Sequence, residues 1–231
     1  MSNINIIATS RLWNQDLLKN LQNIKARNFH YIGTPKELTL PRLLKLNPRY
    51  IFFPHWSHII PSEIYNNFEC VIFHMTDLPF GRGGSPLQNL IARGIRKTKI
   101  SALKCNEEVD AGPIYLKRPL SLHGSAEAIY QRATKEIESM IVKILKTNPM
   151  PVPQKGKVTM FKRRKPRQSN LKGIKTLDEA YNLIRMLDAD GYPHAFLDLG
   201  PFKLLFRRAA RKTDQVLAEV SITLKSSDER S

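Results

Sequence analysis

The sequence has few cysteines, few acidic residues and no long apolar run, and each shortage excludes a class of protein. Only two of the 231 residues are cysteine, which excludes a disulfide-rich secreted scaffold. No run of 18 uncharged apolar residues occurs, so we expect no membrane span. The first ten residues lack the charged start, long apolar stretch and small-residue cleavage site of a signal peptide, so we expect a cytoplasmic protein.

The two cysteines, Cys70 and Cys105, lie in apolar runs that predict buried strands. We expect two reduced thiols in the core of a cytoplasmic protein. A disulfide or a metal-binding pair is the alternative, and no other cluster of residues suggests a metal site.

The shortage of acidic residues leaves 37 basic against 20 acidic side chains, a formal net charge of +17. This charge predicts an anionic partner: nucleic acid, a nucleotide-linked substrate, a polyanionic cofactor or a membrane surface. The segment 154–175 contains nine lysines and arginines and no acidic residue. A solvated basic linker explains that run equally well, and charge alone does not separate RNA from a diphosphate.

The N-terminal part of the chain alternates strand and helix patterns. The predicted strands are 4–8, 29–32, 50–53 and 70–74, and the predicted helices between them are 14–24, 40–46 and 62–68. Short apolar strands separated by helices indicate an α/β fold with a Rossmann-like, twisted, mostly parallel sheet. Functional groups in such sheets gather where the strands end, which here means residues 9–10, 54–58 and 74–77.

The remaining elements predict a second, smaller domain. A helix is expected to begin at Ser85 with a capping box to Gln88, strands follow at 99–105 and 114–118, and the apolar stripe of 125–146 predicts a long helix. Prolines in 147–153 mark a boundary. We therefore predict a catalytic domain at 1–150 and a small, β-rich α+β appendage at 151–231. Its predicted elements are a helix at 176–189 and strands at 195–199, 203–206 and 216–222.

His74 and Asp110 are the residues best suited to proton transfer. A histidine at the end of an apolar strand is more often structural than catalytic, but His74 lies at the functional edge of the sheet and precedes a loop rich in glycine and proline, 77–84. Asp110 begins a second tight turn, 110–112. Imidazole moves protons near pH 7, and a nearby carboxylate fixes its tautomer.

These motifs resemble the folate-dependent formyltransferases, which include methionyl-tRNA formyltransferase, glycinamide ribonucleotide formyltransferase and the sugar-nucleotide N-formyltransferases. The resemblance extends over residues 4–145, and the tail is most similar to the short sugar-nucleotide members. The motifs that carry it, in chain order, are His74 to Pro79, Arg82 and Gly83, Pro86 to Gln88, and Asp110 to Gly112.

The resemblance implies the formyltransferase fold and N10-formyltetrahydrofolate as co-substrate, with no metal. His74 would stabilise the oxyanion that forms when an amine attacks the formyl carbon, and Asp110 would orient His74 and help move the proton. The donor would lie beside the loop, where glycines permit close approach of the backbone. Taken singly, each glycine is also explained by an ordinary turn. The expected donor-binding residues are Leu78, Pro79, Phe80, Gly81 and Gly83.

One position departs from the family pattern. Two residues before the histidine the family carries asparagine as a second oxyanion donor, and this chain has Ile72. Losing such a donor costs about 3–4 kcal/mol of transition-state stabilisation. We expect its replacement in the segment 54–58, with His58 favoured, although a structural role for this histidine is an equal alternative. Asp77, Arg82 and Trp56 are expected to bind the acceptor.

Three functions compete at this stage. The leading hypothesis is formylation of a nucleoside-diphosphate-linked amino sugar, such as a 4-amino-4,6-dideoxyhexose in O-antigen biosynthesis, because the chain is short and basic residues suit a pyrophosphate. The alternative is formylation of methionyl-tRNA, which the charge favours and the reduced second domain disfavours. The third is a non-catalytic, basic nucleic-acid-binding module on an enzyme scaffold. Nucleic acid is thus a less favoured partner, and a homodimer is left open.

Overall fold

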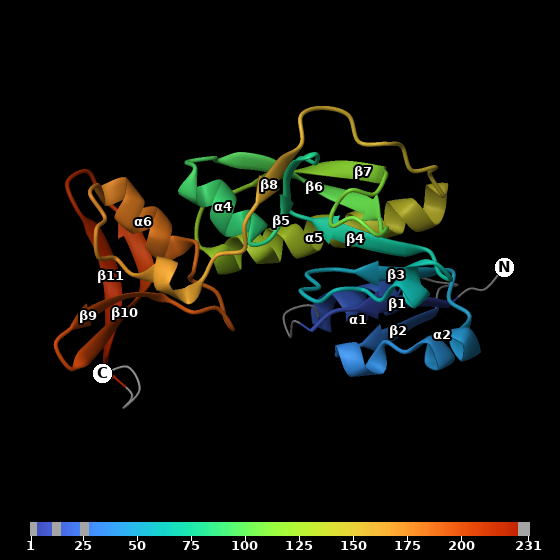
Figure 1. The fold of residues 1–231 in the computed structure, drawn as a ribbon, viewed down its shortest axis with the longest axis horizontal. Coiled ribbons are helices and arrows are strands. Elements are labelled where there is room, and N and C mark those ends of the chain that lie inside the picture. The colour runs from blue at the N-terminus through green and yellow to red at the C-terminus, as the bar shows by residue number, and fades with distance from the viewer. Residues whose placement is uncertain (1–3, 11–14, 24–27, 226–231) are drawn as a thin grey trace. The chain divides into compact units, whose positions relative to one another are not determined.

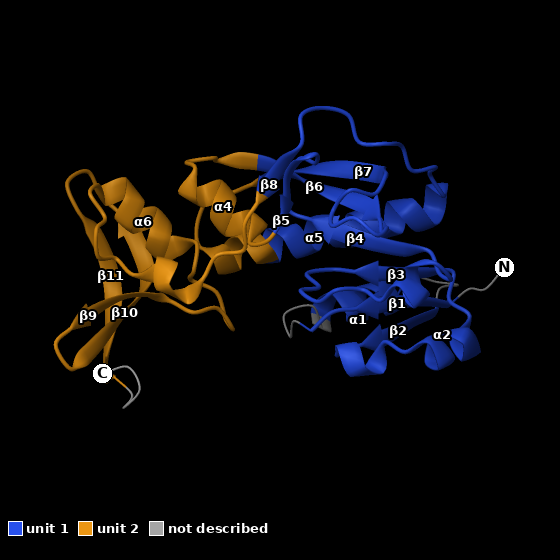
Figure 2. Ribbon diagram, in the orientation of Figure 1, with its two compact units in different colours: residues 1–83, 98–120, 131–160 blue, residues 84–97, 121–130, 161–231 orange. Residues whose placement is uncertain are grey.

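A computed structural model describes residues 4–10, 15–23 and 28–225 of the chain (Figure 1). The described residues fall into two compact units (Figure 2). Unit 1 comprises 1–83, 98–120 and 131–160, and unit 2 comprises 84–97, 121–130 and 161–231. The units interleave along the chain, unlike the predicted ranges 1–150 and 151–231. A division into functional domains at residue 150 stays a prediction.

The main sheet has six strands in the order β2-β1-β3-β4-β6-β7. The first four are parallel, and β6 runs antiparallel to β4. This confirms the predicted α/β fold with a mostly parallel sheet. The strands are β1 (Ile4–Ala8), β2 (Asn28–Ile32), β3 (Tyr50–Phe53), β4 (Cys70–His74), β6 (Lys97–Lys104) and β7 (Ile114–Ser121).

The strands of unit 1 form because they are apolar on both faces. Ile6 and Ile51 on one face and Ile7 and Phe52 on the other are fully buried, as expected for a parallel sheet covered on both sides. Helix α1 is formed at Gln15–Gln22, and the ends of the predicted 14–24 helix lie outside the described residues. The other helices and 3₁₀ turn of unit 1 are η2 (Pro35–Glu37), α2 (Leu40–Leu46) and α3 (Ser62–Tyr65). Helix α4 (Pro86–Ala92) belongs to unit 2, and α5 (Ala126–Thr147) contributes to both units.

Both cysteines are free and buried, which confirms the expectation of reduced core thiols. Burial raises the pKa of Cys105 to about 11, with a further increase from the nearby Asp110 carboxylate. Burial likewise raises the pKa of Cys70 far above its ordinary value. The described thiols are therefore protonated packing groups near neutral pH.

Part of the predicted loop 77–84 is a strand, which corrects the prediction. Strand β5 (Phe80–Gly83) pairs with β8 (Thr159–Phe161) in a two-stranded sheet. Glycine-rich sequence carries little strand signal. The partner strand lies 76 or more residues further on, so local patterns give no indication of the pairing.

The predicted capping box at Ser85 is wrong, whereas Thr176 forms one at the start of α6 (Leu177–Arg185). Ser85 adopts a left-handed conformation with φ of 50°, and its side chain does not cap α4. Instead its Oγ accepts a hydrogen bond from the Arg164 backbone at 3.1 Å, and Gln88 donates to the Met186 carbonyl. Thr176 Oγ1 accepts from the Glu179 N–H at 3.1 Å and so caps the following helix.

Unit 2 contains the predicted β-rich appendage. Helix α6 (Leu177–Arg185) packs on a three-stranded antiparallel sheet ordered β11-β10-β9. Its strands are β9 (Ala195–Leu199), β10 (Phe202–Arg211) and β11 (Val216–Leu224), with the 3₁₀ turn η3 (Pro166–Ser169) before α6. The helix ends at Arg185, four residues short of the predicted end.

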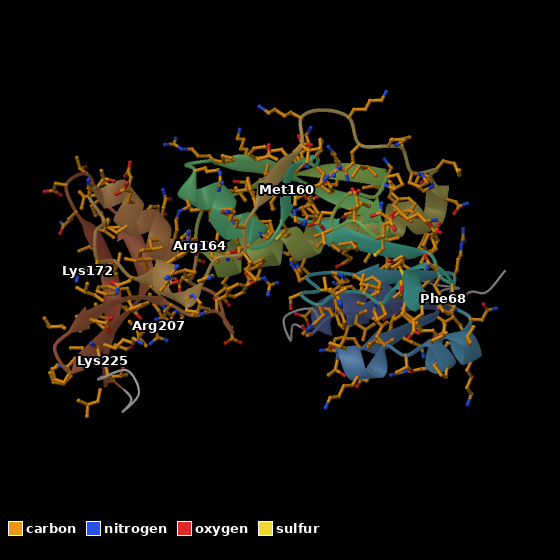
Figure 3. All side chains as sticks on the ribbon, viewed as in Figure 1. Phe68, Met160, Arg164, Lys172, Arg207 and Lys225 are labelled. Atoms are coloured by element: carbon orange, nitrogen blue, oxygen red, sulfur yellow. The ribbon has the colours of Figure 1, made fainter. Side chains whose placement is uncertain are left out.

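Basic side chains are spread over several segments of unit 2. Figure 3 labels Arg164 and Lys172 of the basic run, Arg207 on β10, and Lys225 directly after β11. The positive charge is therefore not confined to the 154–175 segment. Among the described residues, no helix is both long and apolar enough to cross a membrane.

Candidate functional site

His74 is the last residue of β4, where the apolar strand meets the edge of the sheet. It lies opposite Ser101 on β6, and only 7% of its side chain is exposed. The Ser101 hydroxyl donates to the Thr76 carbonyl at 2.8 Å and accepts from the Leu78 N–H at 3.3 Å. These hydrogen bonds hold the backbone that directly follows β4. His74 therefore lies between a strand and a turn that are both fixed by hydrogen bonds.

Both ring nitrogens of His74 face acceptors. Nε2 lies 2.7 Å from the Gly81 carbonyl oxygen, and Nδ1 lies 3.3 Å from Oδ2 of Asp110. A neutral imidazole has one N–H and donates to one of these acceptors at a time, whereas the imidazolium donates to both. The ring can therefore gain and lose a proton without rotating, which suits proton relay.

Asp110 is positioned by its backbone as much as by His74. Its φ is 54°, in the left-handed region, and its Oδ2 accepts a hydrogen bond from the Gly83 N–H at 2.9 Å. A Cβ on Gly112 would lie 1.8 Å from the Lys104 carbonyl oxygen. Only glycine fits at that point, which explains the third residue of the turn.

Gln154 connects the Asp110 turn to the loop 77–84 through hydrogen bonds. Sequence reasoning did not identify this residue. Its Nε2 donates to the carbonyls of Asp110 and Gly112, both at 2.8 Å. Its Oε1 accepts from Nε and Nη2 of Arg82 at 3.1 and 2.9 Å. The amide thus uses both donors and accepts twice, and it connects two motifs that lie far apart in sequence.

The structure brings Arg82 to this network and gives it an internal partner. Besides Gln154, its Nη1 lies 4.0 Å from the Glu108 carboxylate, and 15% of its side chain is exposed. The guanidinium therefore supports the Asp110 turn. Its expected contact with an acceptor stays a prediction.

Asp77 is held between two lysines. Its carboxylate lies 2.5 Å from Lys117 Nζ and 3.0 Å from Lys99 Nζ, and Lys117 also donates to the Leu78 carbonyl. Partial burial raises the pKa of Asp77, but the hydrogen bonds and charges of Lys117 and Lys99 lower it below its ordinary value. One carboxylate between two ammonium groups leaves a net positive charge at this point, and the expected contact of Asp77 with the acceptor stays a prediction.

Much of the polar backbone of the expected donor-binding loop is hydrogen-bonded within the protein. Leu78 is 1% exposed, and its N–H and carbonyl bond to Ser101 and Lys117. The Pro79 carbonyl accepts from Thr159, and the Gly81 carbonyl accepts from Thr76 as well as lying beside His74. Gly81 and Gly83 have φ values of 78° and 101°, which favour glycine. Phe80 is half-buried. Binding of the formyl donor by Phe80 and the rest of this loop stays a prediction.

Ile72 stands where the family has asparagine, and the segment after β3 is where we expect the replacement donor. Ile72 packs against Leu78 in an apolar cluster. Trp56 and His58 follow β3, which pairs in parallel with β4, so both segments leave the same edge of the sheet. His58 is exposed, with its ring 5.3 Å from that of Trp56. The role proposed for His58 stays a prediction.

Trp56 has a buried indole N–H. Its Nε1 has no hydrogen-bond partner within the part of the chain that the structure describes. Buried N–H groups are almost always paired with protein or ordered water. The expected contact of Trp56 with the acceptor stays a prediction, as does the expectation that the segment 54–58, to which Trp56 belongs, supplies the replacement oxyanion donor.

Two family models match the chain. The Formyl transferase model matches residues 21–145, which is more than half of the chain, and the model for the C-terminal domain of methionyl-tRNA formyltransferase matches residues 166–223. The tail therefore matches a domain of the methionyl-tRNA enzymes, and its greater similarity to the short sugar-nucleotide members stays a prediction.

Individual proteins that are similar to this chain belong to the same family. A solved structure named methionyl-tRNA formyltransferase from Clostridium thermocellum is 49% identical, with a TM-score of 0.93 over 96% of this chain and 99% of that one. Methionyl-tRNA formyltransferase of Thermodesulfovibrio yellowstonii is 25% identical over 63% of this chain and 50% of its own length. The chain spans about half the length of the curated relatives it matches.

More distant structures share the fold. A sugar N-formyltransferase from a Shewanella species is 18% identical with a TM-score of 0.70, over 91% of this chain and 99% of that one. The fold, the order of the motifs and the 49% identity all agree with the match to the family model. The chain belongs to the formyl transferase family.

Proposed function

We propose that the chain transfers a formyl group from N10-formyltetrahydrofolate to the amine of methionine on methionyl-tRNA. The observation that carries the chemistry is the buried pair of His74 and Asp110 at the edge of the sheet. The observation that favours this acceptor is the 49% identity to the Clostridium thermocellum protein over nearly the whole chain.

The residues at the sheet edge fit a reduced folate. Trp56 Nε1 is a buried donor available to a polar ring, and Gly81 and Gly83 keep the loop free of side chains at two positions. Because the polar backbone of Leu78 and Pro79 is satisfied internally, these two residues would contribute shape and apolar contact. The bound folate would supply the formyl group.

His74 would move the proton that the acceptor amine loses on attack. For Nε2 to donate to a developing oxyanion, it must exchange the Gly81 carbonyl for the substrate oxygen, since both ring nitrogens are engaged. Asp110 would hold the ring through Nδ1 and stabilise its cation. The proton released by the amine would return to the folate nitrogen when the bond to the formyl carbon breaks.

The comparisons favour the tRNA acceptor over the amino sugar that the sequence put first. The C-terminal family model and the 49% identical structure both carry the methionyl-tRNA name. A net charge of +17 also supports a partner with many backbone phosphates.

A nucleotide-linked amino sugar is the second candidate acceptor. The observation in its favour is the shared fold: the sugar N-formyltransferase from a Shewanella species matches with a TM-score of 0.70 over 91% of this chain.

One experiment separates the two acceptors. The purified chain is incubated with N10-formyltetrahydrofolate and either methionyl-tRNA or a panel of nucleoside-diphosphate amino sugars, and products are identified by mass spectrometry. We expect formylmethionine on tRNA. Formylation of an amino sugar alone would replace the first candidate with the second.

A further inference from the structure

Two lysines and one carboxylate form a cluster at the functional edge of the main sheet. Lys99 lies on β6 and Lys117 on β7, the two strands that follow β4 in the order of the sheet (Figure 1). Both ammonium groups contact Asp77 in the turn after β4: Lys99 Nζ lies 3.0 Å from Oδ2, and Lys117 Nζ lies 2.5 Å from Oδ1. Neither lysine takes part in the proposed formyl transfer.

The two ammonium groups keep N–H donors for a bound molecule. Each lysine carries three such donors. Lys117 donates to Asp77 and to the Leu78 carbonyl, and Lys99 donates to Asp77. These are their polar partners within the described part of the chain, so three of the six N–H groups remain. They are accessible, because 51% of the Lys99 side chain and 27% of the Lys117 side chain is exposed.

The charge of this cluster is positive, and neighbouring lysines reinforce it. The Asp77 carboxylate balances only one of the two ammonium charges. Lys155 and Lys157 are exposed and flank Gly156, where an added Cβ would lie 3.7 Å from the ring of Pro79, two residues after Asp77. Surplus positive charge together with unused N–H donors favours the binding of a phosphate group.

The distance of the cluster from His74 suits a group on the acceptor. His74 pairs with Ser101, and Lys99 lies two residues further along β6, beyond the end of β4. Two residues of a strand span about 7 Å. Both candidate acceptors carry a phosphate one sugar unit away from the part that bears the amine: the terminal nucleotide of methionyl-tRNA carries a 5′-phosphate, and the hexose of a sugar nucleotide carries a diphosphate. An amine beside His74 therefore brings this phosphate toward the cluster.

We propose that Lys99 and Lys117 form a subsite that binds the acceptor phosphate nearest to the reacting amine. The identity of this ligand rests on the proposed function. Asp77 holds one ammonium group at each of its two oxygens, so both lie at the same point of the edge. A phosphate would accept from the three remaining N–H groups and leave the existing hydrogen bonds intact. The glutamate carboxylates of the folate are the competing anion, but Lys155 and Lys157 extend the positive charge beyond what a carboxylate requires.

Binding of inorganic pyrophosphate to the whole chain tests the subsite without turnover. In isothermal titration calorimetry, the double variant Lys99→Met and Lys117→Met should bind about tenfold or more weakly than wild type, because charged hydrogen bonds are lost. The matched control, Lys143→Met and Lys146→Met, removes the same charge from exposed positions of α5. These lie near Asn148, which bonds to Tyr50 at the start of β3 and so at the opposite edge of the sheet. Equal weakening by the two double variants would overturn the proposal.

Acetylation of lysines in the wild-type chain keeps the test independent of folding defects in a variant. The extent of acetylation at each lysine is read by mass spectrometry with and without pyrophosphate. Pyrophosphate should slow the acetylation of Lys99 and leave that of Lys143 unchanged. Equal rates at Lys99 with and without pyrophosphate, or equal protection of both lysines, would overturn the proposal.

Steady-state kinetics of the Lys99 and Lys117 double variant identify the source of the phosphate. The KM for the acceptor that wild type formylates, methionyl-tRNA or a sugar nucleotide, should rise about tenfold or more with little change in kcat. A raised KM for N10-formyltetrahydrofolate in its place would overturn the assignment to the acceptor. Protection of Lys99 by pyrophosphate without formyl transfer by wild type would reject the proposed function and support the phosphate site. Formyl transfer with an unchanged acceptor KM and no protection of Lys99 would reject the subsite alone.

Discussion

His74 Nδ1 lies 3.3 Å from Asp110 Oδ2, and the same carboxylate oxygen accepts a hydrogen bond from the Gly83 backbone. One carboxylate therefore connects the proposed base to the loop that follows it. Its removal should disturb both the imidazole and the loop.

Asp110→Asn is expected to lower kcat by about 10²–10⁴-fold, the usual contribution of a positioned acid–base system. The amide keeps the size of the side chain and an oxygen for Gly83, but it cannot stabilise a cationic His74. KM for both substrates should change little. A folded variant that keeps more than about a tenth of the wild-type kcat would remove Asp110 from the mechanism.

Gln154→Met is expected to lower kcat by about 10–100-fold, because small displacements of a reacting group are costly. Methionine has the length of glutamine but cannot bond to Arg82 or to the Asp110 and Gly112 carbonyls. The control is Gln131→Met on the exposed surface of α5. A changed pH profile of kcat with an unaltered KM would show that Gln154 positions the His74–Asp110 pair. An unchanged kcat and pH profile would mean that the turn needs no support.

The oxyanion donor that replaces the family's asparagine is tested at two positions. His58→Ala should lower kcat with little change in acceptor KM, because a contact made only in the transition state behaves in this way. Trp56→Phe replaces the indole by an aromatic ring without an N–H. A lower kcat in this variant, together with an unchanged kcat in His58→Ala, would identify the indole as the donor. Ile72→Asn in the His58 variant should restore part of the activity.

The buried thiols predict a pH dependence of chemical modification. Because burial raises the pKa of Cys105 to about 11 and that of Cys70 further, native thiols should react slowly with iodoacetamide at about pH 9. Unfolded thiols ionise near pH 8.5, so this contribution to stability is complete below that pH and is lost as pH rises toward 11. Rapid modification of the folded chain at pH 9 would contradict the burial of both groups.

Local patterns predicted the elements whose apolar residues repeat along the chain. Strands at 4–8, 50–53 and 70–74 and a helix at 125–146 were predicted from burial on one or two faces, and the structure has them, with the helix at 126–147. His74 and Asp110 were selected from their motifs, and the structure brings them together, while their catalytic role stays a prediction. The pairing of β5 with β8 was missed because it joins segments distant in sequence. The capping box predicted at Ser85 does not form, because the left-handed backbone of Ser85 directs its hydroxyl to the Arg164 N–H.

The supporting residues were missed for a different reason. Gln154 lies in a stretch of proline and lysine with no motif, and its function depends on carbonyls 44 and 42 residues earlier. Lys99 and Lys117 read as ordinary surface lysines until the sheet brings them to Asp77. Partners of this kind are determined by the tertiary fold, which one sequence without periodic signal does not reveal.

The proposed catalytic role of His74 is tested most directly by formyl transfer with wild type and with His74→Ala, at saturating N10-formyltetrahydrofolate and methionyl-tRNA. We expect formylmethionyl-tRNA with wild type and a loss of about 10²–10⁴-fold in kcat with the folded variant. Equal rates for the two proteins, or no transfer by wild type to methionyl-tRNA or to any amino-sugar nucleotide, would contradict the proposed function.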